Sequence, residues 1–212
     1  GYISNPLFQF LILRWYYRIF IWTRFLWQVS RIELNLNPLH PDKLAGLGFL
    51  SEIDAAFLPL AMLHGAGLSG LIADRIMHAN ASVLDFKVEL VVIVLLVLIL
   101  FLLPLLFFSG QLAHAKRKGI IQYGKLGSEY VAEFESKWLS DSKPKDETLI
   151  GSADIQSLAD LSNSYNTVHE MQISPITKET ILTLAAMTLL PVLPLALTLM
   201  PLEELAKKLF EI

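Results

Sequence analysis

Residues 88–108 read VELVVIVLLVLILFLLPLLFF and carry no charged side chain after Glu89. A helix of this length crosses the hydrocarbon core of a bilayer, which is about 30 Å thick. A basic cluster, Lys116, Arg117 and Lys118, follows this apolar stretch. Because basic residues gather on the cytoplasmic side of spanning helices, the pattern predicts a membrane-spanning helix with its C-terminal end at the cytoplasm.

The composition of the whole chain is that of a membrane protein. Its 212 residues are 54% hydrophobic and 17% charged, with a mean hydropathy of +0.51, whereas about a quarter of the residues of a typical soluble domain are charged. The net charge of −3 gives no electrostatic reason to expect a nucleic-acid partner. The chain has no cysteine, which excludes disulfides, thiolate metal sites and cysteine nucleophiles.

Three further apolar stretches are candidate spans, and they cover residues 7–29, 55–73 and 181–202. The stretch 55–73 contains Pro59 and several glycines, which suit close helix packing or a kinked, re-entrant path. The stretch 181–202 contains several prolines, and we expect these to kink the helix without ending it.

The stretch 7–29 is unusual because it combines many aromatic residues with Arg14, Arg18 and Arg24. Each arginine at the centre of a spanning helix costs about 2.5–3.5 kcal/mol. At 100° per residue, the three share a sector of about 140° with Gln28 and Arg31. Two interpretations remain open. The helix either spans with its arginines facing a bundle interior, an aqueous path or acidic partners, or it lies in the interface with its arginines at the headgroups. Apolar residues on every side of the helix favour the spanning form.

We therefore expect an all-α fold, a multi-pass transmembrane helical bundle of about four spans with a cytoplasmic helical insertion. Its parts are a membrane region over residues 1–110, an amphipathic insertion over 111–176, and a last part over 177–212 that ends in an amphipathic helix. Within the insertion, we expect residues 111–138 to extend the third helix or to dock at the membrane surface. Ser152 is expected to cap a second helix.

The distribution of basic residues predicts the orientation of this bundle. Segments 31–54 and 109–180 share one side and carry ten Lys and Arg, against four in segments 74–87 and 203–212. The side with more basic residues is expected to be cytoplasmic. The chain begins at Gly1, directly before an apolar run, so we expect no signal peptide and a numbering that starts inside a longer protein.

The connection between the first two spans contains His40-Pro41-Asp42-Lys43, the tetrapeptide found at the tip of J-domains. A J-domain needs a basic helix leading directly into this loop, whereas Pro38 and a membrane-type helix precede it here. We expect a turn capped by the Asp42 side chain instead.

Two stretches, LHPDKLAGLGFL over residues 39–50 and IGSADIQSLADLSNSY over residues 150–165, resemble a family of uncharacterised bacterial multi-pass inner-membrane proteins. The resemblance covers most of the chain. It implies a bacterial inner-membrane location and a longer N-terminal region in relatives, which have a glycine at the position of Ala45. The resemblance implies no activity and carries over no functional residues.

Candidate functional residues are the polar groups inside or beside the spans. They are Arg14, Arg18, Arg24, Arg31, Glu52, Asp54 and His64. We expect the two carboxylates to pair with an arginine, Arg24 or Arg31, in preference to forming a proton or cation site. His64 is a candidate haem ligand, metal ligand or proton relay, or it simply hydrogen-bonds a neighbouring helix. No second histidine stands at metal-binding spacing from it, so we expect no metal site.

Two functions fit this pattern. The first is an oligomeric channel or transporter with an arginine-lined path for anions. The second is a non-catalytic accessory or scaffold subunit of a larger membrane complex, whose arginines pair with acidic groups or lipid phosphates. No catalytic motif is visible, so we expect neither an enzyme nor a cofactor. The expected partners are the lipid bilayer and either copies of this chain or other membrane subunits.

Overall fold

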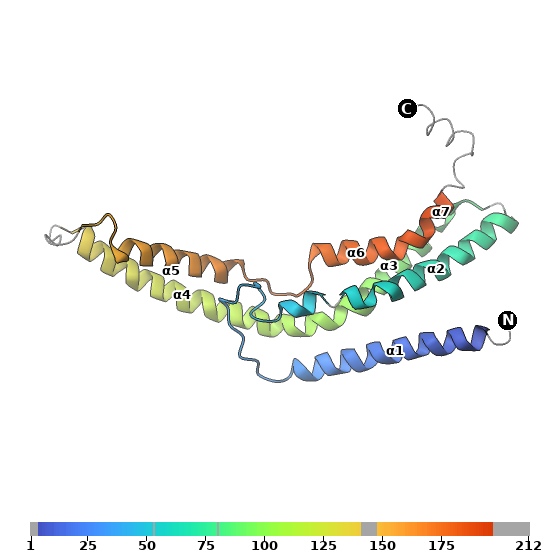
Figure 1. The fold of residues 1–212 in the computed structure, drawn as a ribbon, viewed down its shortest axis with the longest axis horizontal. Helices are drawn as coiled ribbons and strands as arrows, with labels where there is room; N and C mark the ends of the chain where they lie inside the picture. Colours follow the sequence, from blue (N-terminus) through green and yellow to red (C-terminus); the bar gives the residue numbers. More distant parts are fainter. Residues whose placement is uncertain (1–3, 53, 80, 141–147, 197–212) are drawn as a thin grey trace, which may run out of the picture. The chain divides into compact units, whose positions relative to one another are not determined.

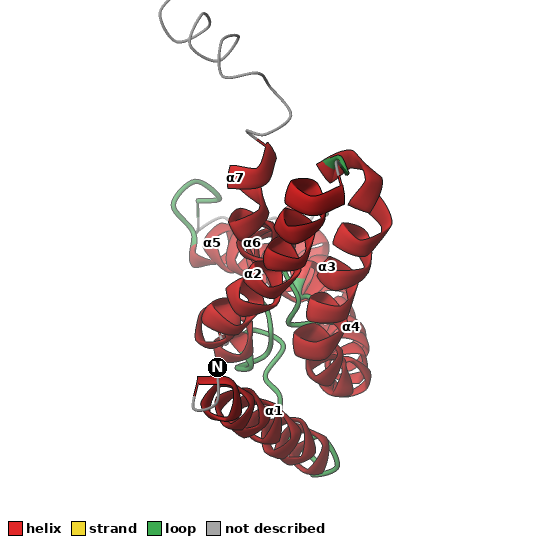
Figure 2. Cartoon of the chain, turned by 90° about the vertical axis from the view of Figure 1, so that its right-hand side faces the viewer, coloured by secondary structure: helices red, strands yellow, loops and turns green. Residues whose placement is uncertain are grey.

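The computed structural model describes residues 4–52, 54–79, 81–140 and 148–196. Within these ranges every regular element is a helix, so the expected all-α class is confirmed for this part of the chain (Figure 2). In chain order the elements are α1 (Ser4–Val29), η1 (Gly48–Glu52), α2 (Asp54–Ala79), η2 (Val83–Phe86), α3 (Lys87–Leu102), η3 (Leu103–Phe108), α4 (Ser109–Trp138), α5 (Ala153–Glu170), α6 (Lys178–Leu189), η4 (Leu190–Val192) and α7 (Leu193–Ala196).

In the described ranges, three helical segments are long and apolar enough to cross a membrane. They are Gly48–His78, Val83–Trp138 and Lys178–Leu195. These segments contain three of the four expected spans, apart from residues 197–202 of the last one, which lie outside the described residues together with the expected C-terminal helix. Helix α1 forms over its whole expected length but is not among the three, and its arginines explain why.

Helix α3 is apolar on every side, and the structure buries only a few of its residues, among them Val97 and Phe101. Val88, Val91 and Ile99 are each more than half exposed. A continuous apolar surface of this kind is unfavourable in water and is satisfied by lipid or by another apolar helix. The burial pattern therefore agrees with the composition of a membrane-spanning segment.

The chain divides into two compact units. Unit 1 comprises Gly1–Gln28, Ser51–Leu105 and Ile176–Ile212, and unit 2 comprises Val29–Leu50 and Leu106–Pro175. The chain passes from one unit to the other after Gln28, Leu50, Leu105 and Pro175. The three apolar helices α2, α3 and α6 belong to unit 1.

In unit 1, helices α2, α3 and α6 lie side by side (Figure 1). Phe57 of α2 stacks on Phe101 of α3 with ring centroids 4.7 Å apart, and Trp22 of α1 meets Phe57 edge-on at 5.0 Å. Such aromatic pairs contribute about 0.5–1.5 kcal/mol beyond the burial of their area. Helix α2 is continuous through Pro59 and does not break there.

In unit 2, helix α5 packs alongside the C-terminal part of the longer helix α4 (Figure 1). The helical structure is continuous from Val83 to Trp138, so residues 111–138 extend the third helix as one of the two expectations had it. Ser152 occupies the N-cap position of α5, but its side chain makes no capping hydrogen bond. The start of α5 is held instead by Asp154, which accepts hydrogen bonds from Lys137 Nζ at 2.8 Å and Trp138 Nε1 at 2.9 Å.

Candidate functional site

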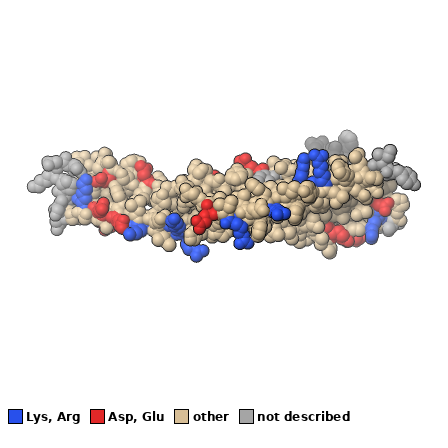
Figure 3. Space-filling model, turned by 90° about the horizontal axis from the view of Figure 1, so that it is seen from below, with Lys and Arg blue, Asp and Glu red and all other residues tan. Residues whose placement is uncertain are grey.

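The arginines of α1 lie on the exposed side of the helix. Ile19 and Leu26 are only 3% and 4% exposed and mark the face of α1 that packs in unit 1. Arg14, Arg18 and Arg24 are exposed, and at 100° per residue their mean direction is about 140° away from that buried face. The three residues, named here the arginine face, do not point into the interior of unit 1. In the space-filling view, basic side chains appear on the surface as several separate groups, some of them beside acidic side chains (Figure 3).

No carboxylate neutralises the arginine face within the described part of the chain. Ion pairs there join other residues, and none includes Arg14, Arg18 or Arg24. The guanidinium carbon of Arg18 lies 5.4 Å from the centroid of the Trp15 ring, a cation–π contact that contributes about 0.5–1 kcal/mol at an exposed site. The arginine face therefore keeps its hydrogen-bonding capacity for an external anion.

The expected pairing of Glu52 with an arginine does not appear among the described residues. Glu52 is exposed and lines a polar groove of about 420 Å³ between the starts of α2 and α6. The groove is shared with Glu179 and the threonines Thr177, Thr180 and Thr183. The two carboxylates give this groove a negative charge. It would therefore repel the anions that the arginines attract. The side chain of Asp54 lies outside the described residues.

His64 is engaged on both of its ring nitrogens. Its Nδ1 lies 2.6 Å from the carbonyl oxygen of Leu60, one turn earlier in α2, and its Nε2 lies 2.5 Å from the hydroxyl of Tyr16 on α1. A carbonyl oxygen can only accept, so Nδ1 carries a proton and, in the neutral ring, Nε2 accepts from the Tyr16 hydroxyl. The geometry is that of the interhelical hydrogen bond expected as the alternative to a ligand role.

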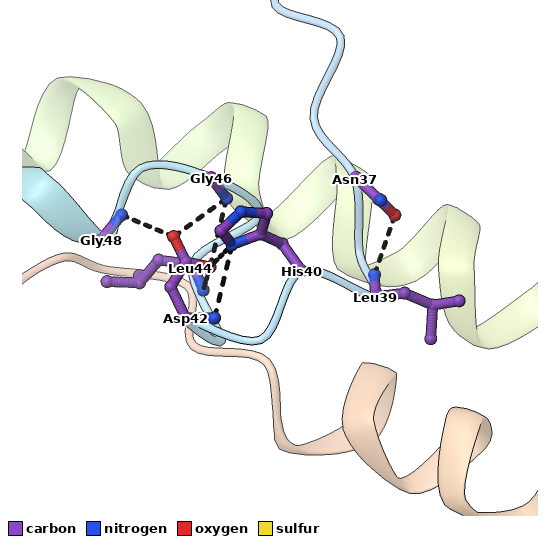
Figure 4. Close-up of polar contacts among 7 residues, drawn as sticks. All are labelled: Asn37, Leu39, His40, Asp42, Leu44, Gly46 and Gly48. Atoms are coloured by element: carbon purple, nitrogen blue, oxygen red, sulfur yellow. Dashed lines mark hydrogen bonds and ion pairs between the residues drawn. The ribbon is translucent and has the colours of Figure 1, made fainter.

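The HPDK loop forms a compact turn around the Asp42 carboxylate (Figure 4). The carboxylate accepts hydrogen bonds from the backbone N–H of Leu44 at 2.8 Å, Gly46 at 3.1 Å and Gly48 at 2.8 Å. The Nδ1 of His40 lies 2.7 Å from the same carboxylate. The expected turn with a capping aspartate is present, and its acidic group points back into its own loop.

These contacts explain the acidity of Asp42. Partial burial alone would raise the pKa of its carboxyl, because burial disfavours the charged form. The backbone N–H groups of Leu44, Gly48 and Gly46, with the His40 side chain, stabilise the carboxylate more strongly and lower the pKa from 3.8 to about 2. Asp42 is therefore ionised at every physiological pH and serves as a fixed structural anion.

The same loop is anchored to the C-terminal end of α5. The Nζ of Lys43 lies 2.6 Å from the carboxylate of Glu170, and the carbonyl oxygen of Lys43 accepts from the N–H of Gln172 at 2.8 Å. The loop also packs on α4, since a Cβ at Gly119 would meet Pro38 and Val168 at 2.8 Å each. A glycine at position 119 is what permits the loop and α5 to approach α4 so closely.

Arg31 belongs to unit 2, whereas the other arginine candidates belong to unit 1. It lines a groove together with Gln111, His114 and Lys118 of α4. Lys118 belongs to the basic cluster noted in the sequence, whereas Gln111 and His114 were not among the candidate residues. Gln111 holds the groove together because its Nε2 donates to the carbonyl oxygens of Ser30 at 2.6 Å and Ile32 at 2.9 Å. The basic run at residues 116–118 was the one signal in the sequence that pointed towards this place.

Among the described residues, no group of three or more His, Asp or Glu side chains is arranged to hold a metal ion. Comparison of the chain with protein-family models, with curated proteins and with solved structures gives no match. A function is therefore argued from the chemistry of the residues themselves.

Proposed function

We propose that this protein is a non-catalytic accessory or scaffold subunit of a larger complex in the bacterial inner membrane. Helices α2, α3 and α6 cross the bilayer, and the arginine face of α1 binds acidic groups of another membrane subunit. The observation that carries the proposal is the placement of Arg14, Arg18 and Arg24 on the side of α1 that does not pack in unit 1.

Three guanidinium groups beside apolar helices need an anionic partner. An arginine in the membrane costs about 3 kcal/mol on insertion scales when nothing compensates it. A carboxylate compensates this cost through paired, charge-assisted hydrogen bonds. Since the described part of the chain offers no such carboxylate to α1, a second protein supplies it.

The apolar interior of unit 1 favours the scaffold function over the transport of ions through a single chain. Among the described residues, the buried polar side chains are Thr180 and Thr188. The hydroxyl of Thr188 donates to the carbonyl oxygen of Leu184 within its own helix at 2.7 Å. An ion path needs a continuous polar lining, and the packed interior of α2, α3 and α6 provides none.

The proposed topology places residues 29–50 and 106–175 in the cytoplasm, because the larger share of basic residues falls there. The chain has no cysteine of its own, so single cysteines report sidedness directly. In right-side-out vesicles, His78→Cys should react with an impermeant maleimide from outside, and Ser128→Cys only after the membrane is opened. The reverse pattern would overturn the orientation.

The scaffold proposal is tested by neutralising the arginine face. The variant Arg14→Gln/Arg18→Gln, extracted from its native membrane in mild detergent, should lose its partner subunit in native mass spectrometry. The control is Arg75→Gln, an exposed arginine at the far end of α2, which should keep the partner. A wild-type chain that carries no other subunit, or a partner that survives the double substitution, would contradict the proposal.

A second function rests on the same placement. If identical chains assemble in a ring, the arginine faces would line a path between copies and attract anions. Wild-type protein in liposomes would then pass chloride, and Arg18→Gln would reduce the flux or its anion selectivity. The scaffold proposal expects no chloride flux above that of empty liposomes.

A further inference from the structure

We infer that the groove between residues 31–36 and the start of α4 is a binding site for the phosphate of an anionic phospholipid headgroup. The groove has a volume of about 440 Å³ and lies wholly within unit 2. Its basic lining residues are Arg31, His114 and Lys118. These residues are separate from the arginine face, but the inference rests on the proposed insertion of the helix that precedes α4.

The charge around the groove is one-sided. No Asp or Glu occurs in the sequence between Glu89 and Glu129, while Lys116, Arg117 and Lys118 all lie in this stretch. Glu33 is the one carboxylate among the lining residues. In the described part of the chain, neither His114 nor Lys118 forms an ion pair. Lys118 thus brings a positive charge to the groove that no described carboxylate pairs with.

Hydrogen bonds join the two walls of the groove. Gln111 fastens the 31–36 segment to α4 through its hydrogen bonds to the carbonyl oxygens of Ser30 and Ile32. Ala115, one turn further along the same helix face, is 8% exposed and forms part of the groove floor. The side chains of Arg31, His114 and Lys118 are therefore arranged around a concave surface whose two walls are joined by hydrogen bonds.

The short distance between the groove and the apolar end of the helix favours a lipid phosphate over a soluble phosphate as the ligand. The apolar stretch ends at Phe108, and Gln111, His114 and Lys118 follow it by three, six and ten residues. At 1.5 Å per residue these lie about 4.5, 9 and 15 Å beyond the apolar end. A headgroup layer is about 5–8 Å thick on each side of the hydrocarbon core. Side chains on a helix tilt towards its N-terminus, so Lys118 reaches back towards that layer.

The test compares two lysines on one face of α4. Purified full-length protein in detergent is mixed with equal amounts of phosphatidylglycerol and phosphatidylcholine, and the retained lipid is counted by native mass spectrometry. Wild type should retain phosphatidylglycerol in preference to phosphatidylcholine, and Lys118→Gln should lower that preference about fivefold. The control Lys125→Gln removes the same charge two turns further from the apolar end and should leave the preference unchanged.

Three results would overturn the inference. Equal retention of the two lipids would show that no anionic headgroup is selected, and equal effects of the two lysine substitutions would show general charge attraction. Displacement of phosphatidylglycerol by millimolar inorganic phosphate would make the site one for a soluble anion. Washing the membranes at high pH tests the proposed insertion separately. A chain that resists this wash but shows no lipid preference would refute the site and leave the proposed insertion intact.

Discussion

The carbonyl oxygen of Thr188 on α6 occupies the space where a side chain at Gly65 on α2 would begin. An ideal Cβ at Gly65 would lie 1.8 Å from that oxygen, far inside van der Waals contact. Nearby, the hydroxyl of Ser69 donates to the carbonyl oxygen of Pro191 at 2.8 Å. The two apolar helices thus meet backbone to backbone, which is how small residues promote helix association in lipid.

We expect Gly65→Ala to destabilise unit 1 by about 1–3 kcal/mol, because the added methyl forces α2 away from α6. Thermal unfolding in detergent measures the effect. Gly67→Ala is the matched control on the same helix, since a Cβ at Gly67 meets nothing within 4 Å. A helical glycine-to-alanine change in open space is neutral or slightly stabilising. Equal melting temperatures for the two variants would refute this account of the contact.

Tyr16→Phe should loosen the attachment of α1 to α2. It removes the hydroxyl that His64 Nε2 accepts from, and a partly buried acceptor without a donor costs about 1–3 kcal/mol. The expected result is a lower unfolding temperature and a shifted ¹⁵N resonance of His64 Nε2. Tyr17→Phe is the control, because the Tyr17 side chain is 64% exposed. An unchanged His64 resonance in Tyr16→Phe would show that the hydrogen bond is absent.

The Asp42 turn should lose stability in acid over a narrow range. The pKa of Asp42 falls from 3.8 to about 2 on folding, so the stabilisation is fully present above pH 3.8 and disappears as the pH drops through 2. Its size is about 2 kcal/mol at neutral pH. Hydrogen exchange of residues 39–50, corrected for intrinsic rates, should show protection falling across this range.

Asp42→Asn should remove that acid-dependent protection, because the neutral amide presents an N–H group where the Gly46 and Gly48 donors need an acceptor. The variant should exchange faster than wild type at neutral pH and show little change between pH 4 and pH 2. Asp160→Asn, an exposed aspartate on α5, should behave as wild type. A wild-type protein with flat protection down to pH 2 would contradict the assignment.

Asp154→Asn should release the start of α5 from α4. The Lys137 side chain and the Trp138 N–H both hydrogen-bond the Asp154 carboxylate, and they lower its pKa. Trp138 is only 4% exposed, so its release should admit water and red-shift its fluorescence in a variant that keeps no other tryptophan. Glu129→Gln on α4 tests for a general charge effect, since Glu129 pairs with the exposed Lys125 at 3.6 Å. A Trp138 emission that stays blue in Asp154→Asn would rule out this anchoring role.

The backbone conformation of Ala45 could not be predicted from the sequence. Its φ is +56°, in the left-handed region that favours glycine, and it directly precedes Gly46 with φ +96°. The side chain of Ala45 is nevertheless 5% exposed and packed. The sequence predicted that Asp42 and the glycines form a turn. It did not predict the strain at Ala45, which arises because the loop must fit between α4 and the end of α5.

The sequence by itself determined the helical class, the three apolar helices and the turn at Asp42. These follow from short-range physics, because a backbone in lipid must satisfy its own hydrogen bonds and an aspartate readily caps a nearby turn. The tertiary structure alone decided which face of α1 is buried, that His64 meets Tyr16, and that Glu52 lines a groove together with Glu179. Those outcomes depend on contacts between residues far apart in the chain, and helix periodicity is equally compatible with several rotations of each helix about its axis.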